Sequence, residues 1–200
     1  MIVYVESNFI LELAFQREDQ ENCSNLLGLA ESQAIDMAIP AFSIGEPYEA
    51  WVRRYKQRKE LYNRLSLELQ ELSRSKPYQE VSKNFHEITA LLVKSGEEEK
   101  QRLDDVLNRI LDIARVIPIE SKTIKASIIY QTSLNLSPQD AIVFASVINH
   151  LLETQNQSNC FITRNSKDFI NPNIISELAN YDCKLLTTFR GGLGYIASHP

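Results

Sequence analysis

The sequence contains little cysteine, and its three cysteines lie far apart. Cys23, Cys160 and Cys183 form no CxxC pair, and no histidine stands at a spacing that suggests zinc. This pattern excludes a disulfide scaffold and a zinc-ribbon site. It indicates small, reduced core residues of a cytoplasmic protein.

Long apolar runs are also absent. No segment reaches the roughly 18 uncharged apolar residues that a membrane-spanning helix needs. The first residues, MIVYVESNF, lack a basic segment and place an acid at position 6, so they do not resemble a signal peptide. We therefore expect a cytoplasmic protein that does not enter a membrane.

An excess of positive charge is missing from the chain as a whole, whose net charge is −5. The average conceals a split, because residues 53–115 hold 14 of the 21 Lys and Arg residues and 11 of the 26 acids. That segment has a net charge of +3, and the remainder has −8. A basic surface beside an acidic site would suit a phosphate polymer and a divalent cation.

The apolar residues alternate between short runs and helical spacing, which predicts an α/β protein with a central parallel sheet covered by helices on both faces. We predict a single domain over 1–200 with a long helical insertion at about 52–115. Within this insertion, Pro77 and Gly96 mark turns. Outside it, the glycines at 191, 192 and 194 are predicted to form a turn near the C-terminus. The predicted strands are 2–5, 35–40, 116–120, 160–163 and 183–188.

Acidic and amide side chains follow two of these strands. Glu6 comes directly after the first strand, and Asn165 and Asp168 follow the strand at 160–163. In parallel sheets, ligands gather outside the carboxyl ends of the strands. Glu46 and Asp140 lie at the starts of predicted helices that can face the same edge. Oxygen ligands without Cys or His favour Mg²⁺ or Mn²⁺ over zinc.

Helix capping offers an alternative role for several of these residues. Ser43-x-x-Glu46, Ser137-x-x-Asp140 and Asn165-x-x-Asp168 all have the spacing of a capping box. Glu6 has no capping role by this pattern, so a ligand and a member of a buried pair both remain open for it. Capping and metal binding are also compatible with each other.

The helix after Glu46 is rich in basic residues. Residues 51–64 contain six basic residues and one acid, interleaved with aromatics. Such a stretch can follow a nucleic-acid backbone and stack bases, and Arg54, Arg58 and Lys59 are our candidates for RNA contact. The alternative is a solvated helix whose aromatics pack inward.

At this point the sequence resembles the PIN-domain family of nucleases. The resemblance rests on VYVESNFILEL, IPAFSIGEPYE, LSPQDAIVFASV and CFITRNSKDF, which occur in the family's order and cover most of the chain outside 52–115. It implies a three-layer α/β/α Rossmann-like fold. It also implies Mg²⁺ or Mn²⁺ bound by acids, and cleavage of an RNA phosphodiester bond by activated water.

Carried over by position, the resemblance gives roles to individual residues. Asn8 and Thr163 would support the acids rather than bind the metal. The candidate catalytic residues are Glu6, Glu46, Asp140, Asn165 and Asp168, and all of them except Asn165 are candidate metal ligands.

Two positions depart from the family pattern. The family usually has Asp where this chain has Glu6, and Asp is common where it has Asn165. These changes leave open a catalytically weakened module that binds RNA or protein.

The resemblance also suggests partners. Many relatives are toxins paired with a small antitoxin, and the fold is often dimeric, although this chain is longer than a minimal toxin. Single-stranded RNA, an antitoxin or other protein, and a second copy of the chain are therefore the expected partners. A third interpretation makes the acids caps only and the helical tract a partner surface, with Leu61, Leu65, Leu69 and Leu72 at packing spacing.

Overall fold

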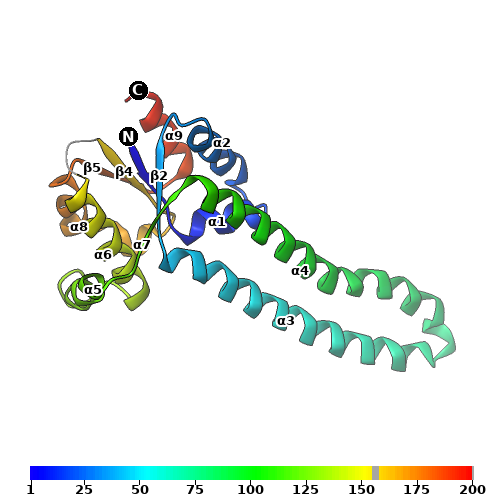
Figure 1. Ribbon diagram of the computed structural model, residues 1–200. Helices are drawn as coiled ribbons and strands as arrows, with labels where there is room; N and C mark the ends of the chain where they lie inside the picture. The colour runs from blue at the N-terminus through cyan, green and yellow to red at the C-terminus, as the bar shows by residue number, and fades with distance from the viewer. Residues whose placement is uncertain (155–157, 200) are drawn as a thin grey trace.

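Five parallel strands form one sheet at the centre of the molecule. The computed structural model describes residues 1–154 and 158–199, with backbone only at 80, 81, 83, 84, 86 and 87. The strand order is β3-β2-β1-β4-β5 (Figure 1). The strands are β1 (Ile2–Tyr4), β2 (Asp36–Pro40), β3 (Arg115–Ile117), β4 (Asn159–Ile162) and β5 (Cys183–Leu186). The predicted parallel sheet is therefore confirmed, strand by strand.

The strand order places a topological switch between β1 and β4. From β1 the chain adds β2 and then β3 on one side, and it returns to the other side of β1 to add β4 and β5. Val3 pairs with Met37 on one neighbour and with Cys160 on the other. In sheets of this kind, ligands bind outside the carboxyl ends of the strands at the switch. A ligand site is therefore expected where β1 and β4 end.

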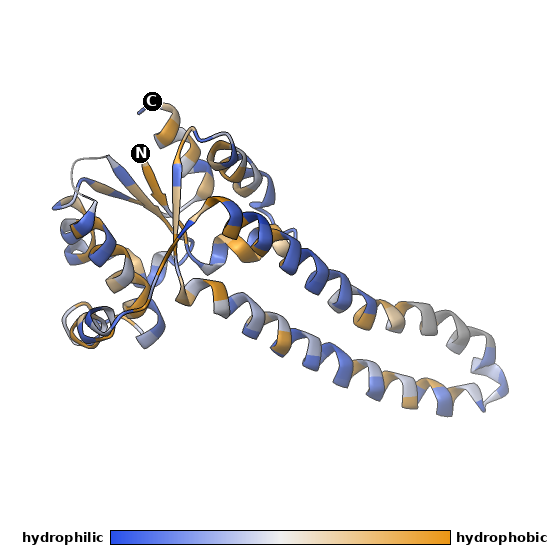
Figure 2. Ribbon diagram, viewed as in Figure 1, coloured by the Kyte–Doolittle hydropathy of each residue, from blue (hydrophilic) through white to orange (hydrophobic). Residues whose placement is uncertain are grey.

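Alternating side chains of the strands form two apolar cores, one on each face. Val3, Ile39 and Ile162 belong to one core, and Tyr4 and Phe161 belong to the other. The first core is closed by α1 (Ser7–Ala14), α2 (Gln20–Glu31), α9 (Phe189–Ala197) and the C-terminal part of α4 (Gln79–Ile113), which contributes Leu103, Val106, Leu107 and Ile110. The second is closed by α5 (Ser121–Ser133), α6 (Pro138–Glu153), α7 (Ser166–Phe169) and α8 (Pro172–Ala179). The two helical layers confirm the α/β/α arrangement, and the hydropathy colouring shows the apolar residues concentrated around the sheet (Figure 2).

Two long helices extend away from the sheet as a hairpin (Figure 1). They are α3 (Phe42–Ser73) and α4 (Gln79–Ile113), joined through the short 3₁₀ helix η1 (Lys76–Tyr78), which contains Pro77. At about 1.5 Å per residue, the 35 residues of α4 span roughly 50 Å. The predicted break at Pro77 is confirmed.

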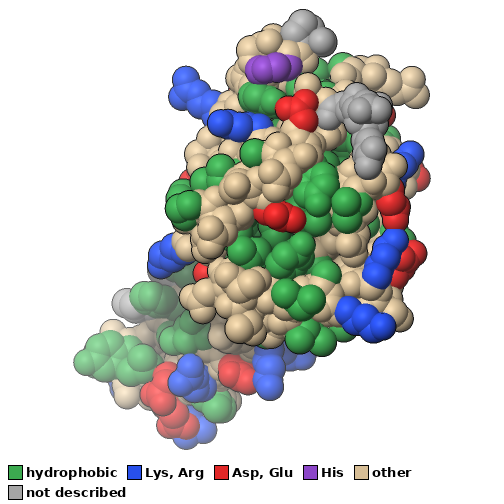
Figure 3. Space-filling model, turned by 90° about the vertical axis from the view of Figure 1, so that its left-hand side faces the viewer, with side chains coloured by type: hydrophobic (Ala, Val, Ile, Leu, Met, Phe, Trp, Pro, Cys, Tyr) green, Lys and Arg blue, Asp and Glu red, His purple; other side chains and the backbone are tan. Residues whose placement is uncertain are grey.

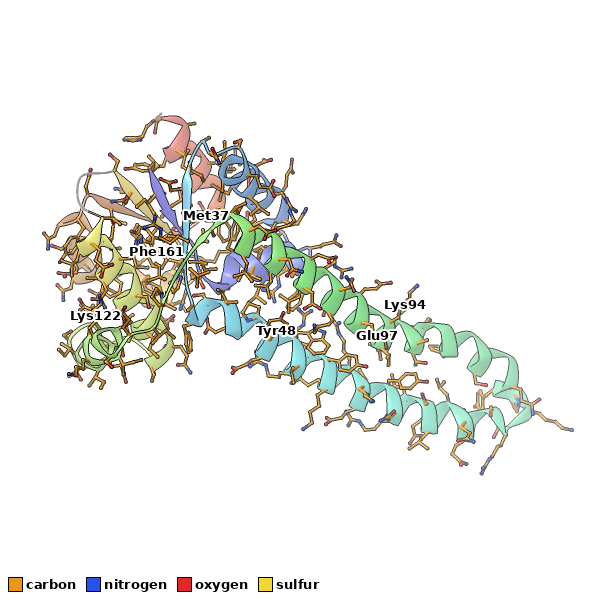
Figure 4. All side chains as sticks on the ribbon, in the orientation of Figure 1. Met37, Tyr48, Lys94, Glu97, Lys122 and Phe161 are labelled. Carbon is orange, nitrogen blue, oxygen red and sulfur yellow. The ribbon has the colours of Figure 1, made fainter. Side chains whose placement is uncertain are left out.

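The predicted turn at Gly96 is wrong, because α4 continues through it. Gly96 lies where Tyr55 of α3 packs against α4, and a Cβ atom there would come within 2.4 Å of the Tyr55 ring. Trp51 stacks on Tyr55 and donates a hydrogen bond from its indole N–H to the Gly96 carbonyl at 2.7 Å. The glycine provides room for an aromatic ring between the two helices, which Figure 4 shows facing each other around the labelled Tyr48 and Glu97.

We predict that Gly96→Ala destabilises the protein by about 1–3 kcal/mol, because overpacking outweighs the helix propensity gained with alanine. Gly28→Ala is the matched control, since Gly28 also lies inside a helix but a Cβ atom added to it would meet nothing within 4 Å. The control is expected to raise stability by about 0.5–1 kcal/mol. Urea denaturation followed by circular dichroism measures both, and equal effects of the two substitutions would contradict the packing role.

The predicted glycine turn near the C-terminus is also wrong. Gly191, Gly192 and Gly194 lie inside α9. A Cβ atom at Gly192 would meet the Ile162 side chain at 2.4 Å, so this glycine lets α9 approach the end of β4. A glycine cluster in the sequence therefore marks close packing of a helix on the sheet here.

The surface beside α5 and α8 is apolar. Ile128 and Ile129 of α5 are more than 60% exposed, and Ile175 of α8 is also exposed. Figure 3 looks onto this side of the molecule and shows hydrophobic side chains gathered near its centre. Among the helices of the described residues, none is both long and apolar enough to cross a membrane.

Candidate functional site

The carboxyl ends of β1 and β4 bring residues from distant parts of the sequence together. Glu6 leaves the end of β1, and Thr163 and Asn165 leave the end of β4. The Thr163 hydroxyl donates to Glu6 Oε1 at 3.1 Å, and the Asn165 backbone N–H donates to the Thr163 hydroxyl at 2.9 Å. Both Glu6 and Thr163 are buried. The switch point of the sheet thus carries a buried carboxylate.

Glu6 is held by four hydrogen bonds. Besides Thr163, the side-chain amide of Asn8 donates to Oε1 at 2.8 Å, and the Ser7 hydroxyl donates to Oε2 at 2.9 Å. The backbone N–H of Asn8 also donates to Oε2, which makes Glu6 the N-cap of α1. The expectation that Glu6 has no capping role is therefore wrong, because α1 begins one residue after the acid. Asn8 and Thr163 both contact Glu6.

Asp140 lies in the first turn of α6 and faces the same edge. The N-cap Ser137 accepts a hydrogen bond from the Asp140 backbone N–H and donates its hydroxyl to Asp140 Oδ2 at 2.5 Å. The other carboxylate oxygen accepts from the side-chain amide of Asn165 at 3.0 Å. A continuous chain of hydrogen bonds therefore runs from Glu6 through Thr163 and Asn165 to Asp140.

Glu46 lies near the start of α3, and both other acids act on it electrostatically. Burial raises the pKa of its carboxyl, the charges of Glu6 and Asp140 raise it further, and a hydrogen bond with Ser7 opposes the shift. The predicted capping box Ser43-x-x-Glu46 is wrong, because α3 begins at Phe42 and Ser43 already lies inside the helix. Glu46 is thus free of the capping role that the sequence suggested.

The donor set of this edge suits a hard divalent cation. It consists of three carboxylates and an amide. Burial is the largest cause of the raised pKa of Glu46, and the repulsion from Glu6 and Asp140, which adds to it, is the part that a cation would relieve. In the arrangement described, no group of three or more Asp, Glu, His or Cys side chains within the described part of the chain is close enough to hold a metal ion. The chemistry of the residues fits Mg²⁺ or Mn²⁺.

Asp168 lies apart from the other candidates. It is exposed in the first turn of α7, and it lines a surface depression together with Leu134, Asn171 and Pro172. Among the described residues, it makes no hydrogen bond or ion pair with Glu6, Glu46 or Asp140. The turn therefore contributes Asn165 to the hydrogen-bonded chain, and the role of Asp168 as a ligand stays a prediction.

An ion pair between a buried carboxylate and an arginine beside the site was not predicted from the sequence. Glu12 of α1 is only 3% exposed, and Arg164 donates to its Oε1 at 2.9 Å. The backbone N–H of Asp19 donates to the other oxygen at 2.9 Å. Arg164 stands between Thr163 and Asn165, so this pair ties the loop after β4 to α1. Three successive residues of that loop each contact an acid.

The three candidates for RNA contact lie on α3 within the hairpin. Arg58 pairs with the buried Glu99 of α4 at 2.9 Å, and Arg54 pairs with the same carboxylate at 3.4 Å while lying over the Phe15 ring. Lys59 is exposed. Arg54 and Arg58 therefore hold α3 against α4, and RNA contact by the three residues stays a prediction.

Comparison with known proteins identifies the fold family. The sequence model of the PIN domain matches residues 3–169. The crystal structure of VapBC2 from Rickettsia felis bound to a DNA fragment from their promoter superposes with a TM-score of 0.47 and 17% sequence identity, covering 92% of this chain and 98% of that chain. No curated protein sequence matches the chain at a significant level.

Proposed function

This chain belongs to the PIN-domain family, whose members are generally nucleases, and we propose that it is an endoribonuclease that uses Mg²⁺ or Mn²⁺ to cleave single-stranded RNA. The observation that carries the proposal is the convergence of Glu6, Glu46 and Asp140 at the switch point of the sheet. The acids come from three separate segments, and two of them raise the pKa of the third. Uncompensated carboxylates at one sheet edge are costly to a fold unless a cation uses them.

The residues of the chain have separate tasks in this proposal. Glu6, Glu46 and Asp140 would hold the cation, and Ser7, Asn8 and Thr163 fix the orientation of the Glu6 carboxylate. Asn165 orients Asp140 through its side-chain amide. A bound divalent ion would supply an activated water and stabilise charge on the phosphate. Because Glu46 has a raised pKa, proton release from this residue would accompany cation binding at low pH.

The test is cleavage of RNA by the purified full chain. We expect cleavage of single-stranded RNA with Mn²⁺ or Mg²⁺, no cleavage in EDTA, and loss of cleavage in Asp140→Asn. This substitution keeps the size of the side chain and an oxygen that can accept from Ser137. Double-stranded RNA and single-stranded DNA of the same sequence serve as substrate controls.

Two outcomes of the cleavage assay would contradict the proposal. If wild type and Asp140→Asn cleave equally, either a contaminant cleaves the RNA or Asp140 is not part of the site, and the assignment of Asp140 is wrong. If neither cleaves in any of the metals, the proposed nuclease is wrong. RNA binding by fluorescence anisotropy then decides whether a binding function remains.

A specific observation supports that second candidate, a binding module without catalysis. Both oxygens of Glu6 and both oxygens of Asp140 already accept hydrogen bonds from protein donors. The hydrogen-bonding capacity of these oxygens is thus met by the protein without a metal. Binding of RNA with wild-type affinity by Asp140→Asn, in the absence of any cleavage, would favour this candidate.

A protein partner forms part of the proposal. The exposed isoleucines of α5 and the exposed leucines at 61, 65 and 72 of the hairpin provide apolar surface for an antitoxin, another protein or a second copy. Leu69 is buried between α3 and α4, so the leucine spacing serves packing within the hairpin at that position. Membership of a toxin–antitoxin pair and formation of a homodimer stay predictions.

A further inference from the structure

A cavity of about 690 Å³ lies at the edge of the sheet opposite the acidic site. It is built from the first residues of β1, β2 and β3 and from the last turns of α2, α4 and α6. In Figure 1 this edge of the sheet lies near the letter N, which marks the N-terminus. Figure 4 labels Met37, one of the residues that line the cavity. Its volume is in the range of pockets that bind small molecules.

One side of this cavity carries Arg115, an exposed arginine at the start of β3. The guanidinium of Arg115 makes no hydrogen bond or ion pair with any residue that the structure describes. It lies near enough to Tyr4 and His150 to lower the pKa of both, although burial is the larger influence on each. An unpaired guanidinium beside a cavity favours an anionic group that can accept two parallel hydrogen bonds.

His150 adds a second unsatisfied polar group to the lining. His150 is buried, with only 7% of the residue exposed. Its Nδ1 is hydrogen-bonded to the Tyr4 hydroxyl at 2.8 Å, whereas its Nε2 is buried and has no partner among the described residues. Burial raises the pKa of Tyr4. If the tyrosine donates its proton to Nδ1, the imidazole presents an N–H donor at Nε2.

The remaining polar lining residues favour hydrogen-bond donors on the ligand. Asp36 is exposed at the start of β2, and Thr154 follows the end of α6. Glu153 is already paired with Lys122 at 2.6 Å, so it contributes little free charge. The C-terminal ends of α2, α4 and α6 bring partial negative charge to the cavity, which favours amino donors on the ligand and opposes an anion. An anionic group of the ligand is therefore expected at Arg115, the basic residue of the lining. The apolar half of the lining consists of Ile2, Ala30, Ile35, Met37, Ala38 and Ile113.

From this combination we propose that the cavity binds a mononucleotide, with the phosphate on Arg115 and the base among the apolar residues. A bare phosphate would leave most of the volume empty. A nucleotide satisfies both halves of the lining, because it carries an anionic phosphate, a flat ring and amino donors. The site is separate from the acidic edge and does not depend on nuclease activity.

Isothermal titration calorimetry of the full chain in EDTA tests this site with AMP, CMP, GMP, inorganic phosphate and ribose 5-phosphate. We expect one nucleotide per chain, with weaker binding of both phosphates that lack a base. Arg115→Ala is expected to weaken nucleotide binding at least tenfold, and Arg115→Lys to weaken it less. The matched control is Arg109→Ala, which removes an arginine of α4 that pairs with Glu31 outside the cavity.

Two results would overturn the proposal. One is the absence of saturable binding for all three nucleotides. The other is equal affinity of wild type and Arg115→Ala, with circular dichroism showing that both are folded. Binding that is lost in Asp140→Asn and kept in Arg115→Ala would assign the nucleotide to the acidic edge, which also contradicts it.

Discussion

Glu6→Gln is expected to lower metal-dependent RNA cleavage by about 10²–10³-fold, the loss typical when one preorganised charged group is removed from a site. Glutamine keeps one oxygen that can cap α1, so the helix start is preserved. With the capping oxygen Oε2 kept, the amide nitrogen replaces Oε1, which faces only donors, from Asn8 and Thr163. Some loss of stability therefore accompanies the loss of charge, and thermal unfolding must be measured beside cleavage rates.

Glu6→Asp is the control that separates charge from length. It keeps the carboxylate and removes one methylene, which restores the residue usual in the family. We expect cleavage to be retained in this variant and lost in Glu6→Gln at equal folded fractions. If Glu6→Gln cleaves RNA as fast as wild type, Glu6 acts only as the cap of α1 and the proposed site must be redrawn around Asp140 and Glu46.

The layered fold could be predicted because its signals are local. Each buried strand is a short apolar run, and each covering helix repeats apolar residues at helical spacing. Glu6, Thr163 and Asn165 could be placed at one edge for the same reason, since parallel strands end on the same side of a sheet. The pairing of Asn165 with Asp140 could not, because it depends on where α6 crosses the sheet.

The glycines show where local signals fail. The sequence favours turns at Gly96 and Gly192, whereas each lies in a helix at a point of close contact with another element. The sequence of α4 does not indicate that Tyr55 packs against Gly96, and the sequence of α9 does not indicate that Ile162 packs against Gly192. Glycine is about 1 kcal/mol less favourable than alanine inside a helix, and tertiary packing outweighs this cost at both positions.

Glu12 is a case in which a signal was present. It lies among Phe9, Ile10 and Leu13 on α1, and an acid on an otherwise apolar helix face is a candidate for a buried ion pair. The sequence could not identify its partner, because Arg164 is more than 150 residues away along the chain. The same contact explains why the loop after β4 takes a fixed position beside α1.

Arg164→Ala is expected to lower the free energy of unfolding by about 3 kcal/mol, since it leaves the Glu12 carboxylate buried without its cation. The Arg164 side chain is about one-third exposed (36%), so water can reach the position that alanine leaves empty. The expected loss in the free energy of unfolding is therefore at the lower end of the range for removing one partner of a buried ion pair. The double substitution Glu12→Gln with Arg164→Ala should cost less than the sum of the single ones. We expect a coupling energy of about 2 kcal/mol from this cycle.

The exposed pair of Arg109 and Glu31 provides the matched comparison. Its atoms are 2.8 Å apart, as close as those of the buried pair, but both side chains are largely accessible to solvent. The same cycle on Arg109→Ala and Glu31→Gln should give a coupling energy of about 0–1 kcal/mol. Urea denaturation of the two cycles measures the difference, and equal coupling energies would contradict the anchoring role of Arg164. Thr163 and Asn165 flank this arginine in the loop after β4. Greater mobility of that loop would therefore also weaken the hydrogen bonds of Thr163 with Glu6 and of Asn165 with Asp140.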